Sequence, residues 1–165
     1  MQITLSRKSH TATIPRGESS IISSAAPVGS RLGNGSFMAM KFQREATGEF
    51  AIAAYTAESV TIGAVNRVEY RDSVAVSHAQ PPAPWPVRSF ADIAADAIAH
   101  ATRMQAEIVL IGTGRTLRFP RPDALRPLIE ARIGYEVMDT SAACRTYNVL
   151  LGEGRQVAAL LLFEA

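Results

Sequence analysis

The second half of the sequence alternates strand-like and helix-like segments, and this alternation constrains the fold more than any other feature. Short apolar runs rich in valine, isoleucine and leucine are separated by segments that start with helix-capping residues or proline. The pattern predicts, in order, a strand at 107–112, a helix at 122–134, a strand at 135–139, a helix at 140–151 and a strand at 156–163. Strands that alternate with helices favour an α/β arrangement in which helices cover the sheet.

The region before this alternation consists of short strand-like runs and one proline-rich connector. The runs predict a hairpin-rich opening. They lie at 50–55, 59–65, 67–71 and 73–78. Four prolines within 81–86 exclude a helix and a central strand, so we expect an extended connector there, with Trp85 lying on the domain. Ser89 as N-cap, followed by an apolar stripe, then predicts a helix at about 90–104.

The chain has 165 residues, of which 47% are hydrophobic, and this size favours one domain around one core. Residues 1–40 are rich in Ser, Thr, Gly and Arg and show no regular period, so we interpret them as a disordered leader or an over-long start, with Met38 or Met40 as the natural beginning. A single α/β domain is predicted at 41–165. This interpretation implies a bacterial cytoplasmic protein. If residues 1–37 are instead a transit peptide, the protein is mitochondrial.

Charge is unevenly divided along the chain. Residues 1–40 hold four basic residues and one acid, whereas the remaining 125 residues hold 13 basic and 14 acidic residues. The sequence pI of about 9.0 therefore describes the leader and gives no sign of a basic binding face on the domain. We predict no nucleic-acid partner.

The sequence lacks the residue patterns of most cofactor and metal sites. Cys144 is the only cysteine, which excludes an internal disulfide, a redox-active cysteine pair and a multi-cysteine zinc site. The three histidines show no metal-ligand spacing. The stretch 112–117 lacks the third glycine of a dinucleotide fingerprint, and no P-loop lysine follows it. From these missing patterns we predict no cofactor and no metal. No apolar run reaches the roughly 18 residues of a membrane helix, so we also predict no transmembrane segment.

Two predicted strands end in residues suited to a ligand site. Gly112, Thr113 and Gly114 follow one strand, and Asp139 and Thr140 follow the next. Ligands of open α/β sheets gather outside the carboxyl ends of strands, so neighbouring strands would place both loops around one crevice. A tight turn and a helix cap account for the same residues without a ligand, with Asp139 or Thr140 satisfying the first amides of the helix.

Cys144 and Arg145 extend this candidate crevice into the following helix. The helix dipole and the neighbouring arginine could lower the pKa of the thiol and make it a nucleophile, although no base is placed beside it. A small buried cysteine is the interpretation that we favour, because free cysteine is among the most buried residue types. Arg115, Arg118 and Arg121 could join Arg145 in an anion site or form a solvated rim.

Several stretches together resemble a known family. They are "VLIGTG", "FP" and "GYEVMDTSAACRTYNVLLGEGRQVAALLL", with Tyr70, Ser73 and "WPV" at 85–87 fitting the same pattern. The chain resembles, over about residues 41–163, a small family of bacterial and archaeal α/β proteins of unknown function, which includes the mitochondrial complex I assembly factor 3 and the adipogenesis-associated domain protein. The resemblance implies a three-layer, single-domain α/β fold with a central mixed sheet flanked by helices, and no established enzymatic activity.

The resemblance and the residue pattern favour a non-catalytic binding or assembly module, which we expect to assist the assembly or biogenesis of a membrane-associated respiratory complex similar to complex I. Its expected partners are proteins, among them subunits or assembly factors of a membrane-associated respiratory complex, and a homo-oligomer stays open. No catalytic residue is predicted. The alternative is a small-molecule-binding protein or an enzyme that uses the crevice between 112–114 and 139–145, with Cys144 or Asp139 as its reactive group.

Overall fold

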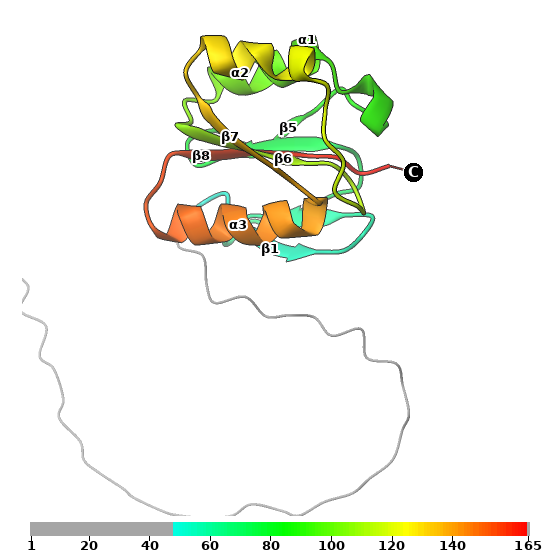
Figure 1. Ribbon diagram of the computed structural model, residues 1–165. Helices are drawn as coiled ribbons and strands as arrows, with labels where there is room; N and C mark the ends of the chain where they lie inside the picture. The colour runs from blue at the N-terminus through cyan, green and yellow to red at the C-terminus, as the bar shows by residue number, and fades with distance from the viewer. Residues whose placement is uncertain (1–47, 165) are drawn as a thin grey trace, which may run out of the picture. The chain divides into compact units, whose positions relative to one another are not determined.

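The computed structural model describes residues 48–164, and the leader predicted at 1–40 lies outside them. A five-stranded sheet forms the middle of the domain (Figure 1). In spatial order its strands are β5 (Ala83–Pro84), β4 (Val74–Ser77), β8 (Val157–Leu161), β6 (Ile108–Gly112) and β7 (Gly134–Met138). β8 pairs antiparallel with β4 and parallel with β6, and β6 pairs parallel with β7. The predicted mixed sheet is confirmed.

A second, smaller sheet is an antiparallel meander that precedes the central sheet in the chain. It consists of β1 (Ile52–Tyr55), β2 (Val60–Ile62) and β3 (Val68–Tyr70). These strands lie within the runs expected from the sequence, so the hairpin-rich opening is confirmed.

Three layers result because both faces of the central sheet are apolar. Figure 1 shows short helices above the sheet, with α3 (Thr140–Gly152) and β1 below it. The upper layer contains α1 (Ala95–Ala99), α2 (Arg126–Glu130) and the 3₁₀ helices η1 (Phe90–Asp92), η2 (His100–Arg103) and η3 (Pro122–Leu125). Along β8, Ala158 and Leu160 belong to the core beneath the short helices, whereas Ala159 and Leu161 belong to the core against α3. This strand is therefore buried on both faces.

The helix expected at 90–104 is broken into η1, α1 and η2. The break lies at Ile93 and Ala94, whose backbones are extended. The Asp92 carboxylate accepts hydrogen bonds from the Ser89 amide and hydroxyl (both 2.9 Å), so the first turn is closed locally. Ile93 is nevertheless buried, so its apolar character reflects packing in the core and not a continuous helical face.

The helix expected at 122–134 is also shorter than predicted. Pro127 has no amide to donate to the preceding turn, and the chain changes from 3₁₀ to α geometry between Leu125 and Arg126. α2 ends at Glu130, and Arg132 adopts a positive φ of 57° as the chain turns back. Gly134, the last residue of the helix expected at 122–134, instead begins β7.

The proline-rich connector contributes the short edge strand β5. Proline has no amide hydrogen to donate, and an edge strand tolerates this because it pairs with a neighbour on one side only. Trp85 follows it and is buried against the upper helical layer. Its indole nitrogen donates to the Ala97 carbonyl (3.0 Å), so the only polar atom of this side chain has a partner.

Candidate functional site

The two loops of the predicted crevice lie side by side, because β6 and β7 are neighbouring parallel strands. Their backbones are joined by hydrogen bonds. The Thr113 amide donates to the Met138 carbonyl (2.9 Å), and the Thr140 amide donates to the Gly114 carbonyl (2.9 Å). The sequence thus predicted correctly which loops meet. The structure shows that they meet through direct contacts between their main chains.

Thr140 occupies the space between these loops. Its hydroxyl accepts from the Gly114 amide (2.9 Å) and donates to the Leu162 carbonyl (2.9 Å), and the residue is buried. A Cβ atom at Gly112 would lie 3.0 Å from the Cα and Oγ1 atoms of Thr140, which explains why this position has no side chain. Thr140 therefore joins the ends of β6 and β8 to the start of α3.

Asp139 is the N-cap of α3. Its Oδ1 atom accepts a hydrogen bond from the Ala142 amide (2.8 Å), which satisfies one of the amides that lack a partner in the first turn. The capping role expected from the sequence is confirmed for Asp139, while Thr140 is the first residue of the helix.

Cys144 is fully buried in the core between α3 and the central sheet. Burial raises the pKa of its thiol to about 12, and the opposing effect of Arg145 is smaller. The thiol is therefore protonated at neutral pH and inaccessible from solvent. These properties favour a packing role over nucleophilic chemistry.

The residues after Cys144 attach α3 to the small sheet. Arg145 donates to the Tyr55 hydroxyl (3.3 Å), and the Tyr147 hydroxyl donates to the Phe50 carbonyl (3.3 Å). The Asn148 amide bonds both backbone groups of Ile52: its Oδ1 accepts from the amide (2.9 Å) and its Nδ2 donates to the carbonyl (2.7 Å). The "CRTYN" stretch is thus a structural attachment between α3 and β1.

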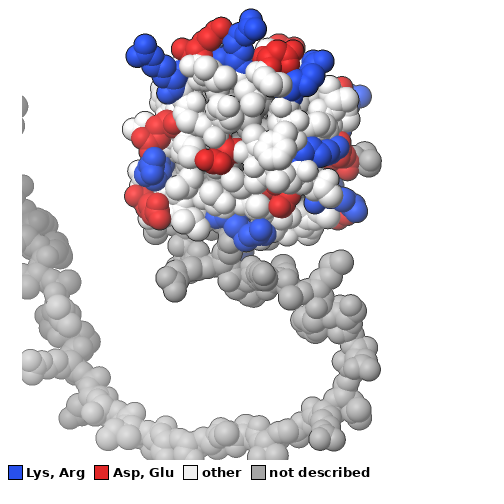
Figure 2. Space-filling model, in the orientation of Figure 1, with Lys and Arg blue, Asp and Glu red and all other residues white. Residues whose placement is uncertain are grey.

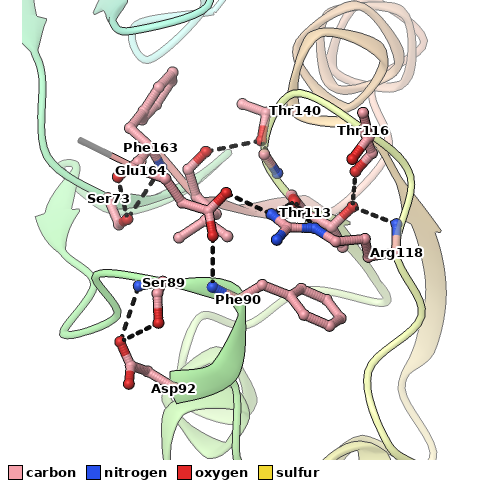
Figure 3. A network of polar contacts seen from close by, with 12 residues as sticks. Ser73, Ser89, Phe90, Asp92, Thr113, Thr116, Arg118, Thr140, Phe163 and Glu164 are labelled. Atoms are coloured by element: carbon pink, nitrogen blue, oxygen red, sulfur yellow. Dashed lines mark hydrogen bonds and ion pairs between the residues drawn. The ribbon is translucent and has the colours of Figure 1, made fainter.

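A polar network that the sequence did not reveal lies at the same end of the sheet (Figure 3). Arg118 forms an ion pair with Glu164 (2.6 Å), and its guanidinium lies 4.5 Å above the centre of the Phe90 ring. The other carboxylate oxygen of Glu164 accepts from the Phe90 amide (2.8 Å). These bonds, above all that to Arg118, hold the pKa of Glu164 below its usual value. The network joins η1, the loop after β6 and the segment after β8.

Thr113 and Arg118 fold the loop after β6 onto itself. The Thr113 hydroxyl donates to the Thr116 carbonyl (2.9 Å) and accepts from the Arg118 amide (3.0 Å). The Arg118 guanidinium in turn donates to the Thr113 carbonyl (2.6 Å). This fixed loop exposes two large apolar side chains, Leu117 (50% exposed) and Phe119 (73% exposed). We name residues 115–121 the docking loop.

The docking loop was not identified from the sequence, where its arginines were considered only as an anion site or a solvated rim. The structure separates these arginines. Arg115 forms an ion pair with Glu58 (2.6 Å), Arg118 pairs with Glu164, and Arg121 lies 3.6 Å from Asp123. Each therefore has a carboxylate partner. The available signal was the pair of apolar residues between the arginines in "RTLRFPR".

Other site types find little support in the part of the chain that the structure describes. Residues 48–164 contain no group of three His, Cys, Asp or Glu side chains placed to hold a metal ion. None of their helices is long and apolar enough to cross a membrane. A mainly apolar groove of about 400 Å³ lies beside the β2–β3 hairpin, away from the loops at 112–114 and 139–145. On the face shown in Figure 2, basic and acidic side chains are interspersed around a largely uncharged surface.

Comparison with known proteins identifies the family. A family model described as "Protein of unknown function (DUF498/DUF598)" matches residues 52–162. The chain belongs to this family. Among solved structures, the domain is similar to a crystal structure of a Bordetella parapertussis protein, with a TM-score of 0.65 and 37% identity over 73% of this chain and 100% of that one. A Bordetella pertussis protein described as a Mth938-like domain has a TM-score of 0.63 and 31% identity, over 74% of this chain and 91% of that one.

Two curated relatives illustrate the range of the family. The bovine (Bos taurus) NADH dehydrogenase [ubiquinone] 1 alpha subcomplex assembly factor 3 is 36% identical over 80 residues, which are 47% of this chain and 44% of the bovine protein. An uncharacterized protein of Rhodobacter capsulatus is 40% identical over 86 residues, which are 52% of this chain and 64% of that one. The match thus spans less than half the length of the bovine assembly factor.

Proposed function

We propose that this family member is a non-catalytic binding module that recognises protein partners through the docking loop. The observation that carries the proposal is the exposure of Leu117 and Phe119 on a loop that is fixed by internal hydrogen bonds. Large apolar side chains on a surface are typical of interaction sites when they lie together. Aromatic and arginine residues are also the side chains most often responsible for binding energy at interfaces.

The fixed geometry of the loop favours binding. Arg118 is held by Thr113, Glu164 and Phe90 at once, so the neighbouring apolar side chains project from an ordered backbone. A preorganised loop loses less conformational freedom on binding than a flexible one, and more of the interaction energy then appears as affinity.

The partners that we propose are subunits or assembly factors of a respiratory complex similar to complex I. Relatives named NADH dehydrogenase [ubiquinone] 1 alpha subcomplex assembly factor 3 support this choice. The residues of the predicted crevice support a non-catalytic function, because capping, backbone bonding and burial account for Asp139, Thr140 and Cys144.

The proposal is tested by replacing the apolar side chains of the docking loop. In the tagged full chain, the double variant Leu117→Ser/Phe119→Ser should lose co-purification of NADH dehydrogenase subunits or assembly factors from the cell that naturally produces the protein. Val149→Ser is the matched control, because Val149 is 56% exposed on α3 and far along the chain from the loop. Mass spectrometry of the purified material measures the difference.

Recovery of none of these proteins with the wild-type chain, or equal recovery with the double variant, would show that the docking loop does not recognise them. Thermal unfolding of both variants checks that the fold is retained.

A further inference from the structure

The central sheet has one long edge that pairs with no further strand of the described chain. This edge is β7, which pairs only with β6. The Gly134 amide donates to the Glu107 carbonyl (3.0 Å), and the Met138 carbonyl accepts from the Thr113 amide (2.9 Å), so the backbones of these two residues face β6. Because successive residues of a strand point their backbone groups to opposite sides, Tyr135 and Val137 direct their amides and carbonyls outward.

The other three edges in residues 48–164 are closed or short. On β1, the Asn148 side chain takes the hydrogen-bonding positions beside Ile52 that a neighbouring strand would use. β5 has two residues, one of which is Pro84 without an amide. β3 has three residues and carries the exposed Glu69–Arg71 ion pair. β7 alone combines five residues with no proline, and such an edge is a template for an additional strand.

The side chains of β7 indicate what the additional strand would contain. Tyr135 and Val137 are half-buried and pack against the core beneath the short helices, so apolar side chains beside them would extend that core. Glu136 lies between them on the opposite face, is exposed, and takes part in none of the ion pairs formed by described residues. A basic side chain opposite Glu136 would complement it.

We propose that β7 binds an extended segment of a partner protein in which apolar and basic residues alternate, and that this segment becomes the sixth strand of the central sheet. The outward backbone groups of Tyr135 and Val137 supply hydrogen bonds, and the alternating side chains supply specificity. A second copy of this chain fits less well, because a symmetric antiparallel pair centred on Glu136 would place two carboxylates directly opposite each other. This surface shares no residue with the docking loop, and the inference does not depend on the proposed function.

The test uses the full chain and three synthetic peptides. They are acetyl-KVKVKVK-amide, its charge-reversed form acetyl-EVEVEVE-amide, and the first peptide with every backbone nitrogen methylated. NMR of the ¹⁵N-labelled protein should show shifts of the Tyr135, Glu136 and Val137 amides with the lysine peptide, which should bind about fivefold more tightly than the glutamate peptide. The methylated peptide should not bind, because it keeps the side chains and loses the donors.

Two variants separate this inference from the proposed function. Glu136→Lys should reverse the preference between the two unmethylated peptides, and an exposed substitution of this kind leaves the fold intact. Leu117→Ser/Phe119→Ser should bind the lysine peptide like the wild type. Equal binding of the methylated peptide, or shifts confined to other elements, would overturn the proposal. Shifts of the β7 amides that depend on protein concentration without any peptide would also overturn it, since the occupant would then be a second copy.

Discussion

At the scale of single residues, Thr140 shows how the structure itself can account for a buried polar side chain. Its hydroxyl is both an acceptor for Gly114 and a donor to Leu162. We expect Thr140→Val to destabilise the protein by about 1–3 kcal/mol, because the amide of Gly114 and the carbonyl of Leu162 would each lose a buried partner. Urea unfolding measures this loss. Thr140→Ser is the control, since it keeps the hydroxyl, and equal destabilisation by both variants would contradict the assignment.

The thiol of Cys144 gives a second prediction at this scale. Because its pKa is raised to about 12 by burial, iodoacetamide should alkylate it at pH 8 only at the rate at which the protein unfolds, and Arg145→Ala should leave that rate unchanged apart from any effect on stability. Mass spectrometry follows the reaction. Fast alkylation of the folded protein that slows in Arg145→Ala would instead support a reactive site at 139–145.

The same thiol should affect stability in alkaline solution. The unfolded chain loses the thiol proton near pH 9.0, whereas the folded chain keeps it until about pH 12. Between these pH values the thiol ionises only in the unfolded chain, which lowers the free energy of the unfolded state. The free energy of unfolding should therefore fall as pH rises through this range.

At the scale of elements, Glu164 connects the segment after β8 to η1 and to the loop after β6. Its carboxylate joins η1 through Phe90 and the docking loop through Arg118. Because these bonds lower its pKa, their stabilising contribution is present above 4.5, the value of an unperturbed glutamate, and is lost as pH falls through the lower value in the folded protein. We expect the Phe90 amide resonance to titrate with a midpoint below pH 4.5.

NMR titration of the Phe90 amide tests this expectation, with Glu164→Gln as the control. The variant should show no such transition, because a side-chain amide does not titrate in this range. A midpoint at or above 4.5 in the wild type would show that the Arg118–Glu164 pair is not formed in solution.

The elements also show where sequence reasoning succeeds and where it stops. The type and order of the strands from 107 onward follow from local apolar periodicity, which is a property of consecutive residues. The break at Ile93 and Ala94 could not be predicted in this way, because both residues continue the apolar stripe and the backbone is extended for tertiary packing. Asp139 was predictable as a cap because its partner, Ala142, is three residues away.

At the scale of the whole molecule, the missed features depend on contacts between distant segments. Arg118 and Glu164 are 46 positions apart, and Asn148 and Ile52 are 96 positions apart. Nothing in the local sequence around either pair indicates its partner. The proximity of the loops at 112–114 and 139–145 was predictable because adjacent parallel strands bring their carboxyl ends together, which is a rule of topology. That these loops bond directly to each other depends on the close approach of Thr140 to Gly112, which only the folded chain reveals.

The position of β8 has a consequence for how the protein is made. This strand is the last of the eight strands in residues 48–164, yet it lies between β4 and β6. While the ribosome is still translating, β4 and β6 have emerged but have no neighbour between them, and the apolar faces of the nascent sheet stay unsealed. Completion of the sheet must therefore wait until Leu161 has left the exit tunnel, and the nascent chain stays open to chaperone capture and proteolysis until this segment has emerged.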